Sequence, residues 1–179
     1  MRLLAFACAA FALTGCQSVP DENARATAQL ENARATAQLL PTQGNKTFGE
    51  ATFEQVGSKV RVAIFVQNLK PGQQHGLHIH EVGDCGNQAE NAKDHFNPFG
   101  KPHGSPKGTE HHAGDLPALI ANKRGRANVQ RDVDLITVGT GPSGIVGRSL
   151  IVHAKPDDYK SQPAGDSGDR IACGVIRGG

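Results

Sequence analysis

The chain has 179 residues, enough for one domain of ordinary size, and contains 22 Gly and 10 Pro but no Trp. Its formal net charge of +2 is too small to indicate nucleic acid as a partner, or an anionic membrane surface bound through charge. Eight His and four Cys are the more informative counts.

Residues 1–15 are typical of an export signal, because Arg2 supplies a positive start and Leu3–Leu13 an apolar core too short to span a bilayer. The segment leads into the letters LTGC, which resemble a bacterial lipobox, cut directly before a Cys that then receives a lipid. We therefore expect lipidation at Cys16. The alternative is an ordinary secretory signal whose cleavage site contains Cys16. Gln17, rather than Asp, after that Cys indicates sorting to the outer membrane of a Gram-negative cell.

Residues 16–45 contain the nonapeptide ENARATAQL twice, at Glu22–Leu30 and Glu31–Leu39. Nine residues at about 100° each place equivalent residues on opposite helix faces, which excludes a coiled-coil stripe. The composition favours partial helix, ending near Pro41. We expect a lipidated spacer that holds a domain, residues 46–179, off a membrane surface.

Short strands are predicted throughout that domain. Alternating apolar residues predict a strand over Lys59–Leu69, and the turn pair Pro71-Gly72 follows. Further candidates are Thr47–Val56, Gly76–Val82, Gly125–Leu135, Ser149–Ala154 and Arg170–Ile176. We therefore predict an all-β sandwich or barrel.

Two long segments, Gly83–Gly114 and Lys155–Asp169, are rich in Gly, Pro, Asp and His and are predicted to be loops. Loops of that length in a compact domain are usually functional.

The cysteines are divided by the export signal. Cys8 leaves with the signal and Cys16 is the lipidation candidate, so Cys85 and Cys173 remain. An exported protein meets an oxidising environment, and we expect these two to form a disulfide. The bridge would close a loop of 88 residues (173 − 85), worth roughly 4 to 5 kcal/mol in the chain-entropy treatment.

Histidines cluster at two places. His78 and His80 are two residues apart on a predicted strand, so they share a face and either bind one metal ion or lie on a solvated surface. The first long loop and the residue after it supply His95, His103, His111, His112 and Asp115, which form either a metal site or a polar loop. Three imidazoles and one carboxylate suit tetrahedral zinc. His78, His80 and His153 suit Cu(II) if a fourth nitrogen comes from elsewhere.

Four blocks of sequence together resemble the Cu/Zn superoxide dismutases of the exported bacterial kind: GLHIHEVGDC, HFNPFGKPHG with HHAGDL, GIVGRSLIVHAKPDD, and GDSGDRIACGVI. The resemblance runs from about residue 47 to 179. It implies a Greek-key, eight-stranded β-sandwich or flattened barrel of immunoglobulin-like architecture, with the metal site on its outer face.

The resemblance also implies a role for each matching residue. The copper ligands would be His78, His80, His95 and His153, and the zinc ligands His95, His103, His112 and Asp115. Asp157 would link a copper histidine to a zinc histidine, and Cys85 and Cys173 match the family disulfide. Arg170 would attract the anionic substrate and His95 would supply a proton, so these two are the expected catalytic residues. His75 and His111 match no ligand position.

The implied activity is dismutation of superoxide to O₂ and hydrogen peroxide by copper redox cycling, with one copper and one zinc per subunit. We expect an enzyme of the periplasm or cell envelope that protects the envelope from superoxide, tethered to the membrane only by its lipid. The resemblance allows a homodimer. The alternatives are a domain that stores or transfers copper without turnover, and a tethered structural domain stabilised by metals. Asp169, directly before Arg170, is unusual for the family and leaves open whether it or the nearby Lys155 and Lys160 dominates substrate attraction.

Overall fold

The computed structural model describes residues 33–179, and its regular secondary structure is almost entirely β-strand. The strands are β1 (Arg34–Pro41), β2 (Phe48–Val56), β3 (Lys59–Gln67), β4 (Gln74–His75), β5 (Leu77–His80), β6 (Leu119–Ile120), β7 (Ala127–Val133), β8 (Ser149–His153), β9 (Arg170–Val175) and β10 (Arg177–Gly178), with one short 3₁₀ helix, η1 (Glu90–Ala92). Across the described residues we find no helix with the length and apolar character needed to span a membrane.

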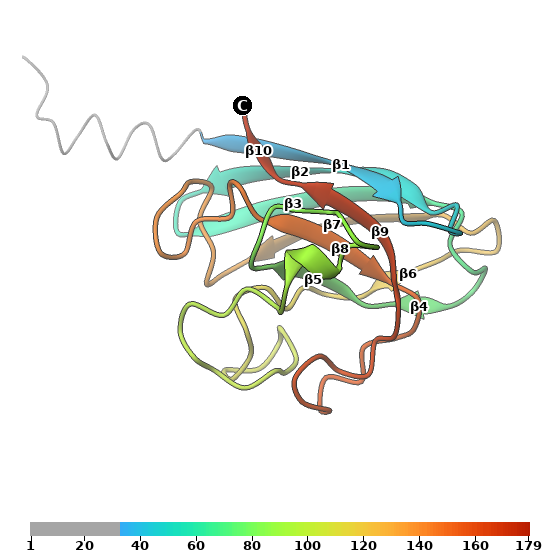
Figure 1. Ribbon diagram of the computed structural model, residues 1–179. Helices are drawn as coiled ribbons and strands as arrows, with labels where there is room; N and C mark the ends of the chain where they lie inside the picture. The colour runs from blue at the N-terminus through green and yellow to red at the C-terminus, as the bar shows by residue number, and fades with distance from the viewer. Residues whose placement is uncertain (1–32) are drawn as a thin grey trace, which may run out of the picture.

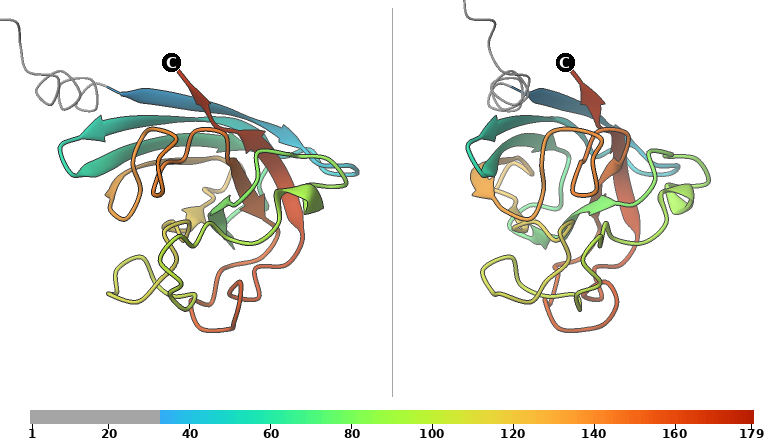
Figure 2. Two further views of the ribbon diagram at one scale, coloured as in Figure 1. Left: turned by 60° about the vertical axis from the view of Figure 1, so that its left-hand side comes forward. Right: turned by 90° about the vertical axis from the view of Figure 1, so that its left-hand side faces the viewer.

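Eight strands form one curled sheet in the order β5-β8-β9-β1-β2-β3-β7, with β10 also paired to β1. Every pairing is antiparallel, and β4 and β6 form a separate two-stranded sheet. The large sheet wraps around an interior, as the turned views in Figure 2 show. The predicted all-β fold and the six predicted strands are thereby confirmed.

Alternation of side chains explains the packing. In β3 the even-numbered residues Val60, Val62, Ile64 and Val66 are buried and the residues between them are partly exposed. The same two-residue period holds in β1 and β2. Apolar side chains from these strands, from β5 and from β8 meet in one main core.

The predicted domain boundary at residues 45 and 46 is wrong. The second nonapeptide copy provides most of β1, which pairs with β2 along one edge and with β9 and β10 along the other. Ala35, Ala37 and Leu39 point into the core, so the alternation A-T-A-Q-L is a strand pattern. Helix propensities differ by only tenths of a kcal/mol per residue, whereas burying one Leu contributes about 1.5–3 kcal/mol. Tertiary burial therefore overrides the local helix preference, and this part of the expected spacer belongs to the domain.

The export signal over residues 1–15, Cys16 and the first nonapeptide copy at residues 22–30 lie outside the described residues. The predicted disulfide is present. Cys85 and Cys173 are bonded with their Cα atoms 5.8 Å apart, which ties the first long loop to β9. Both long loops gather at one end of the sheet, in the lower part of Figure 1.

Candidate metal centre

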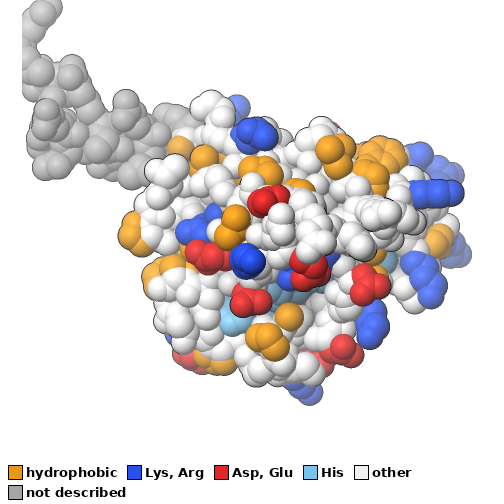
Figure 3. Space-filling view, viewed as in Figure 1, with side chains coloured by type: hydrophobic (Ala, Val, Ile, Leu, Met, Phe, Trp, Pro, Cys, Tyr) orange, Lys and Arg blue, Asp and Glu red, His pale blue; other side chains and the backbone are white. Residues whose placement is uncertain are grey.

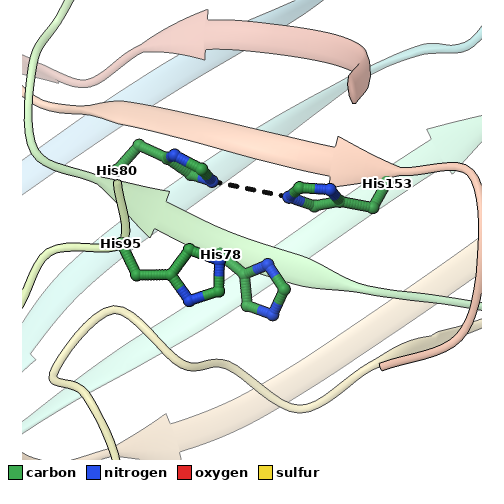
Figure 4. A group of neighbouring side chains, drawn as sticks. All are labelled: His78, His80, His95 and His153. Atoms are coloured by element: carbon green, nitrogen blue, oxygen red, sulfur yellow. Dashed lines mark hydrogen bonds between the residues drawn. The ribbon is translucent and has the colours of Figure 1, made fainter. Parts of the chain in front are cut away.

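Strand β5 places the first two histidines. It pairs with β8, with His78 opposite Ile151 and His80 opposite Ser149. Successive residues point to opposite faces, so His78 and His80 lie on one face while Ile79 enters the core. His153 ends β8, next to an irregularity in its pairing with β9. Three imidazoles from two neighbouring strands are thus brought together (Figure 4).

The other edge of β5 pairs with two segments of the first long loop. Isolated bridges join His80 to His95 and His78 to Asp115. The Ile79 amide donates to the Gly114 carbonyl at 2.9 Å, and the Phe96 amide donates to the Ile79 carbonyl at 2.8 Å. A Cβ at Gly114 would collide with the Ile79 carbonyl oxygen, so glycine permits this close approach. Backbone pairing therefore positions His95 and Asp115.

The four predicted copper ligands form one cluster. One ring nitrogen from each histidine lies within 4.8 Å of those of the other three, and no residue of the four is more than 5% exposed. The Nε2 atoms of His80 and His153 face each other at 3.4 Å (Figure 4). His80 Nδ1 donates to the Lys93 carbonyl and His153 Nδ1 to the Gly168 carbonyl, which leaves a lone pair on each Nε2.

These nitrogens fit a bound metal ion. His78 Nδ1 and His95 Nε2 are buried and have no hydrogen-bond partner among the described residues. Buried polar atoms without partners are costly and rare in folded proteins. A cation bound among the lone pairs would satisfy these atoms and relieve the contact between the two Nε2 atoms. Four imidazole nitrogens are a donor set that suits Cu(II).

A second cluster shares His95 and contains His103, His112 and Asp115, all buried. Asp115 Oδ1 lies 2.9 Å from Nδ1 of His95, 3.0 Å from that of His103 and 3.4 Å from that of His112. Three imidazoles and one carboxylate form a closed set of four ligands, which suits structural zinc. The structure thus brings together all seven predicted ligands in two sets that share one residue.

Asp157 links the two clusters through hydrogen bonds to one histidine of each. Its Oδ2 accepts from His78 Nε2 at 2.7 Å and its Oδ1 from His103 Nε2 at 3.0 Å. These hydrogen bonds hold the Nε2 proton on both rings and turn their Nδ1 atoms towards the two metal positions. The Tyr159 amide also donates to Asp157 Oδ1, at 2.7 Å. The predicted linking role of Asp157 rests on this geometry.

Burial keeps most of these rings neutral. It lowers the pKa of His78, drives the pKa of His80 and His153 well below the usual value, and lowers that of His95 to about 4. Neutral imidazoles are the form that binds metal.

In His103 and the two carboxylates, hydrogen bonds together affect the pKa more than burial does. Burial alone would lower the pKa of His103, but hydrogen bonds to Asp115 and Asp157 outweigh it and raise that pKa to about 9. Burial alone would raise the pKa of Asp115 and Asp157, yet hydrogen bonds from His103 and other partners hold both well below the usual range. Both carboxylates are therefore ionised and able to balance a bound cation.

Arg170, the first residue of β9, lies beside the first cluster in an open cleft of about 510 Å³ that also includes His80, His95 and His153. Its guanidinium donates to the carbonyls of Ala89 and Lys93, on either side of η1. The sequence does not reveal these two carbonyls, because only the folded backbone brings them to Arg170. The second cluster contributes His95 and His112 to the cleft, whereas His103 and Asp115 are not among its lining residues.

His75 and His111 contribute to neither cluster, as predicted, but both are buried. The Nδ1 atom of His75 lies 2.9 Å from the carbonyl of His153, and that of His111 lies 2.7 Å from the carbonyl of His112. Both therefore support the backbone of a candidate ligand, which the sequence pattern did not indicate.

The residues of both clusters lie in a segment that matches a known protein family. Residues 47–176 match the family described as Copper/zinc superoxide dismutase (SODC). The chain is 40% identical over 146 residues to Superoxide dismutase [Cu-Zn] 2 of Aquifex aeolicus, covering 78% of this chain and 84% of that protein. It is 38% identical over 151 residues to Superoxide dismutase [Cu-Zn] of Deinococcus radiodurans, covering 77% and 81%.

Two solved structures are similar to the whole fold. The clock protein EA4 has a TM-score of 0.73 at 36% identity, covering 82% of this chain and 95% of that one. A double mutant of a SOD-like protein from Bacillus subtilis has a TM-score of 0.72 at 35% identity, covering 79% and 96%.

Proposed function

The chain belongs to the copper/zinc superoxide dismutase family, and we propose that it dismutes superoxide to O₂ and hydrogen peroxide with the two clusters as its metal centre. His78, His80, His95 and His153 would hold copper, and His95, His103, His112 and Asp115 would hold zinc. One observation carries the assignment of these residues. The nitrogen cluster borders an open cleft containing a fixed guanidinium, as a site that admits a small anion requires.

The chain's own groups would act on the anion as follows. Bound copper supplies the one-electron exchange with superoxide. Arg170, held by two carbonyls, presents a fixed positive charge that attracts and orients the anion. His95 has one ring nitrogen in each cluster, so its Nε2 can take up and release a proton while Nδ1 remains with the zinc set.

The remaining residues maintain that arrangement. Asp157 fixes the ring orientation of His78 and His103, and the zinc set closes the loop that carries His95. The disulfide ties to β9 the loop segment whose Ala89 and Lys93 carbonyls accept hydrogen bonds from Arg170. Zinc would then have a structural role and adjust the basicity of His95, whereas copper would be the redox metal.

We also propose that the protein works outside the cytoplasm, in the periplasm or cell envelope, where it would remove superoxide that reaches the envelope. The export signal over residues 1–15 and the lipobox cysteine Cys16 support this proposal, with Gln17 favouring the outer membrane. Mass spectrometry of the mature protein should find a lipid-modified N-terminal Cys16, and an unmodified residue there rules the anchor out. Analytical ultracentrifugation of the purified domain tests the homodimer.

The experiment that tests the activity uses protein loaded with copper and zinc in graded amounts. We expect superoxide dismutation to rise in proportion to copper content and to be lost in His80→Ala, with zinc-only protein inactive. Fully loaded protein that dismutes superoxide no faster than buffer contradicts the proposal. That result together with tight copper binding would instead support the alternative, a domain that stores or transfers copper.

A further inference from the structure

The mouth of the copper cleft carries more negative than positive protein charge. Three carboxylate residues line the cleft together with its histidines, namely Glu90, Asp94 and Asp169, and all three are exposed. Arg170 is the only Lys or Arg among the lining residues in the part of the chain that the structure describes. Three carboxylates against one guanidinium leave an excess of two negative charges. Figure 3 shows red acidic side chains around the pale-blue histidines.

The carboxylates stand outside the histidines. His80, His95 and His153 are nearly completely buried, whereas Glu90, Asp94 and Asp169 are exposed. Bound copper and zinc would add positive charge at the floor of the cleft. An anion that arrives from solvent therefore meets the carboxylates before it reaches the metals. We call these three residues the acidic rim.

Glu90 acts on Arg170 most directly. Its Oε1 lies 3.6 Å from Arg170 Nε, and its side chain is 62% exposed against 15% for the arginine. Glu90 begins η1, and the carbonyls on either side of this helix hold the same guanidinium. The segment that fixes Arg170 thus also places a carboxylate beside Nε, the one guanidinium nitrogen that donates to neither carbonyl. An incoming anion must compete with Glu90 for the positive charge on this side of the guanidinium.

The neighbouring lysines do not compensate for the acidic rim. The Nζ of Lys155 lies 3.7 Å from Asp166 Oδ1, so its charge is already partly paired. Lys155 and Lys160 are both outside the set of residues that line the cleft. At the cleft, the negative charge of Asp169 and the other rim carboxylates therefore outweighs the positive charge of Lys155 and Lys160.

We propose that Glu90, with Asp94 and Asp169, limits anion capture at the copper cleft and selects monoanions over dianions, so that Glu90 opposes Arg170. The proposal rests on the proposed function, because it concerns the anion that the same cleft admits. A dianion experiences twice the repulsion of a monoanion, so phosphate is excluded more strongly than superoxide. Salt screens charges near a surface, and anion capture should therefore rise as salt is added.

The test compares Glu90→Gln, Asp169→Asn and the double variant with Glu50→Gln, all loaded with copper and zinc. Glu50→Gln is the matched control, because it removes the same charge from an exposed position on β2, away from the cleft lining. Two quantities are measured between low and moderate ionic strength. One is kcat/KM for superoxide by stopped flow, and the other is the affinity for azide and inorganic phosphate from the visible spectrum of Cu(II).

For the wild type and Glu50→Gln we expect kcat/KM and azide affinity to rise with ionic strength. In the double variant both should be about three- to tenfold higher at low salt, and phosphate should gain more than azide. The salt dependence should also reverse, because Asp94 then only balances Arg170 and the positive charge of the bound metals decides the sign. Wild-type values that fall with salt, or rim variants that match Glu50→Gln, overturn the proposal. Loaded protein without dismutation would contradict the proposed function alone, since azide and phosphate binding still test the acidic rim.

Discussion

The carbonyl oxygen of Lys93 accepts a hydrogen bond from the guanidinium of Arg170 at 2.9 Å. The same oxygen accepts the Nδ1 proton of His80 at 2.7 Å. Lys93 has φ of 65° and ψ of −147°, a backbone region used almost only by glycine. One strained peptide group therefore positions a candidate copper ligand and the cation that faces the substrate, while the lysine side chain itself is exposed.

Replacing Lys93 with Gly should stabilise the protein. The strain at such a position costs about 1–3 kcal/mol, and the extra backbone freedom of glycine in the unfolded chain costs about 0.5–1 kcal/mol. We therefore expect Lys93→Gly to raise the free energy of unfolding by about 0.5–2 kcal/mol in urea titrations. Lys123→Gly, at an exposed turn position with ordinary φ, is the control and should lower it. Equal losses in the two variants would show that Lys93 is not strained.

Asp157→Asn tests the link between the two clusters. An amide cannot accept from both His78 and His103, because its nitrogen is a donor. Loss of such a supporting hydrogen bond typically lowers metal affinity by about 10–100-fold. We expect that loss for zinc in competition with a chromophoric chelator, together with a changed Cu(II) EPR spectrum. Asp158→Asn removes the neighbouring exposed carboxylate and should bind both metals as the wild type does. Equal zinc affinity in the two variants contradicts the linking role of Asp157.

The metal-free protein should be most stable near pH 6.5. Burial lowers the pKa of His95 to about 4, so below pH 6.5 the unfolded chain binds a proton that the folded chain does not bind. The free energy of unfolding therefore falls by about 1.4 kcal/mol for each pH unit down to pH 4. His103 has the opposite sign. Its raised pKa of about 9 contributes stability that is complete below pH 6.5 and is lost as pH rises to 9.

Urea midpoints of the metal-free protein between pH 4.5 and 9 measure both slopes. Zinc-loaded protein is the comparison, because zinc replaces the proton on His103 and should remove the decline between pH 6.5 and 9. A metal-free midpoint that stays constant from pH 6.5 to 4.5 would show that the buried histidines are not held neutral.

The sequence predicted those features that depend on residue type and spacing. The alternation of Val60, Val62, Ile64 and Val66 identifies a strand, and the spacing of His78 and His80 places both imidazoles on one face. It could not predict the strain at Lys93, because its φ is imposed by the folded loop. Nor could it place Glu90 beside Arg170, since the two are 80 positions apart (170 − 90) and meet only in the fold.

The nonapeptide repeat shows a second limit of prediction from sequence. Its composition predicts helix, and identical letters in two copies suggest one role for both. The second copy occupies the position between β2 and β9, where it gains partners on both edges. A local pattern cannot show which segment gains a tertiary site, so the strand in the second copy was missed.

Truncation tests the corrected domain boundary. A chain that begins at residue 33 keeps β1 and should unfold at the same urea concentration as the mature protein. A chain that begins at residue 46 matches the boundary predicted from sequence, but it leaves β2, β9 and β10 without a shared partner. We expect the shorter chain to be unfolded or aggregated, as judged by circular dichroism and gel filtration. A folded, metal-binding chain from residue 46 would restore the original boundary.

Two adjacent leucines provide a finer test of β1. Leu39 is fully buried in the core and Leu40 is 60% exposed. If residues 34–41 form a strand, Leu39→Ala should cost about 2–5 kcal/mol of unfolding free energy, because it leaves a cavity among packed side chains. Leu40→Ala should change it by at most about 1 kcal/mol, since an exposed position has little burial to lose. A spacer outside the domain would make both substitutions neutral. The difference between the two variants in urea titrations therefore measures whether the second nonapeptide copy is part of the dismutase fold.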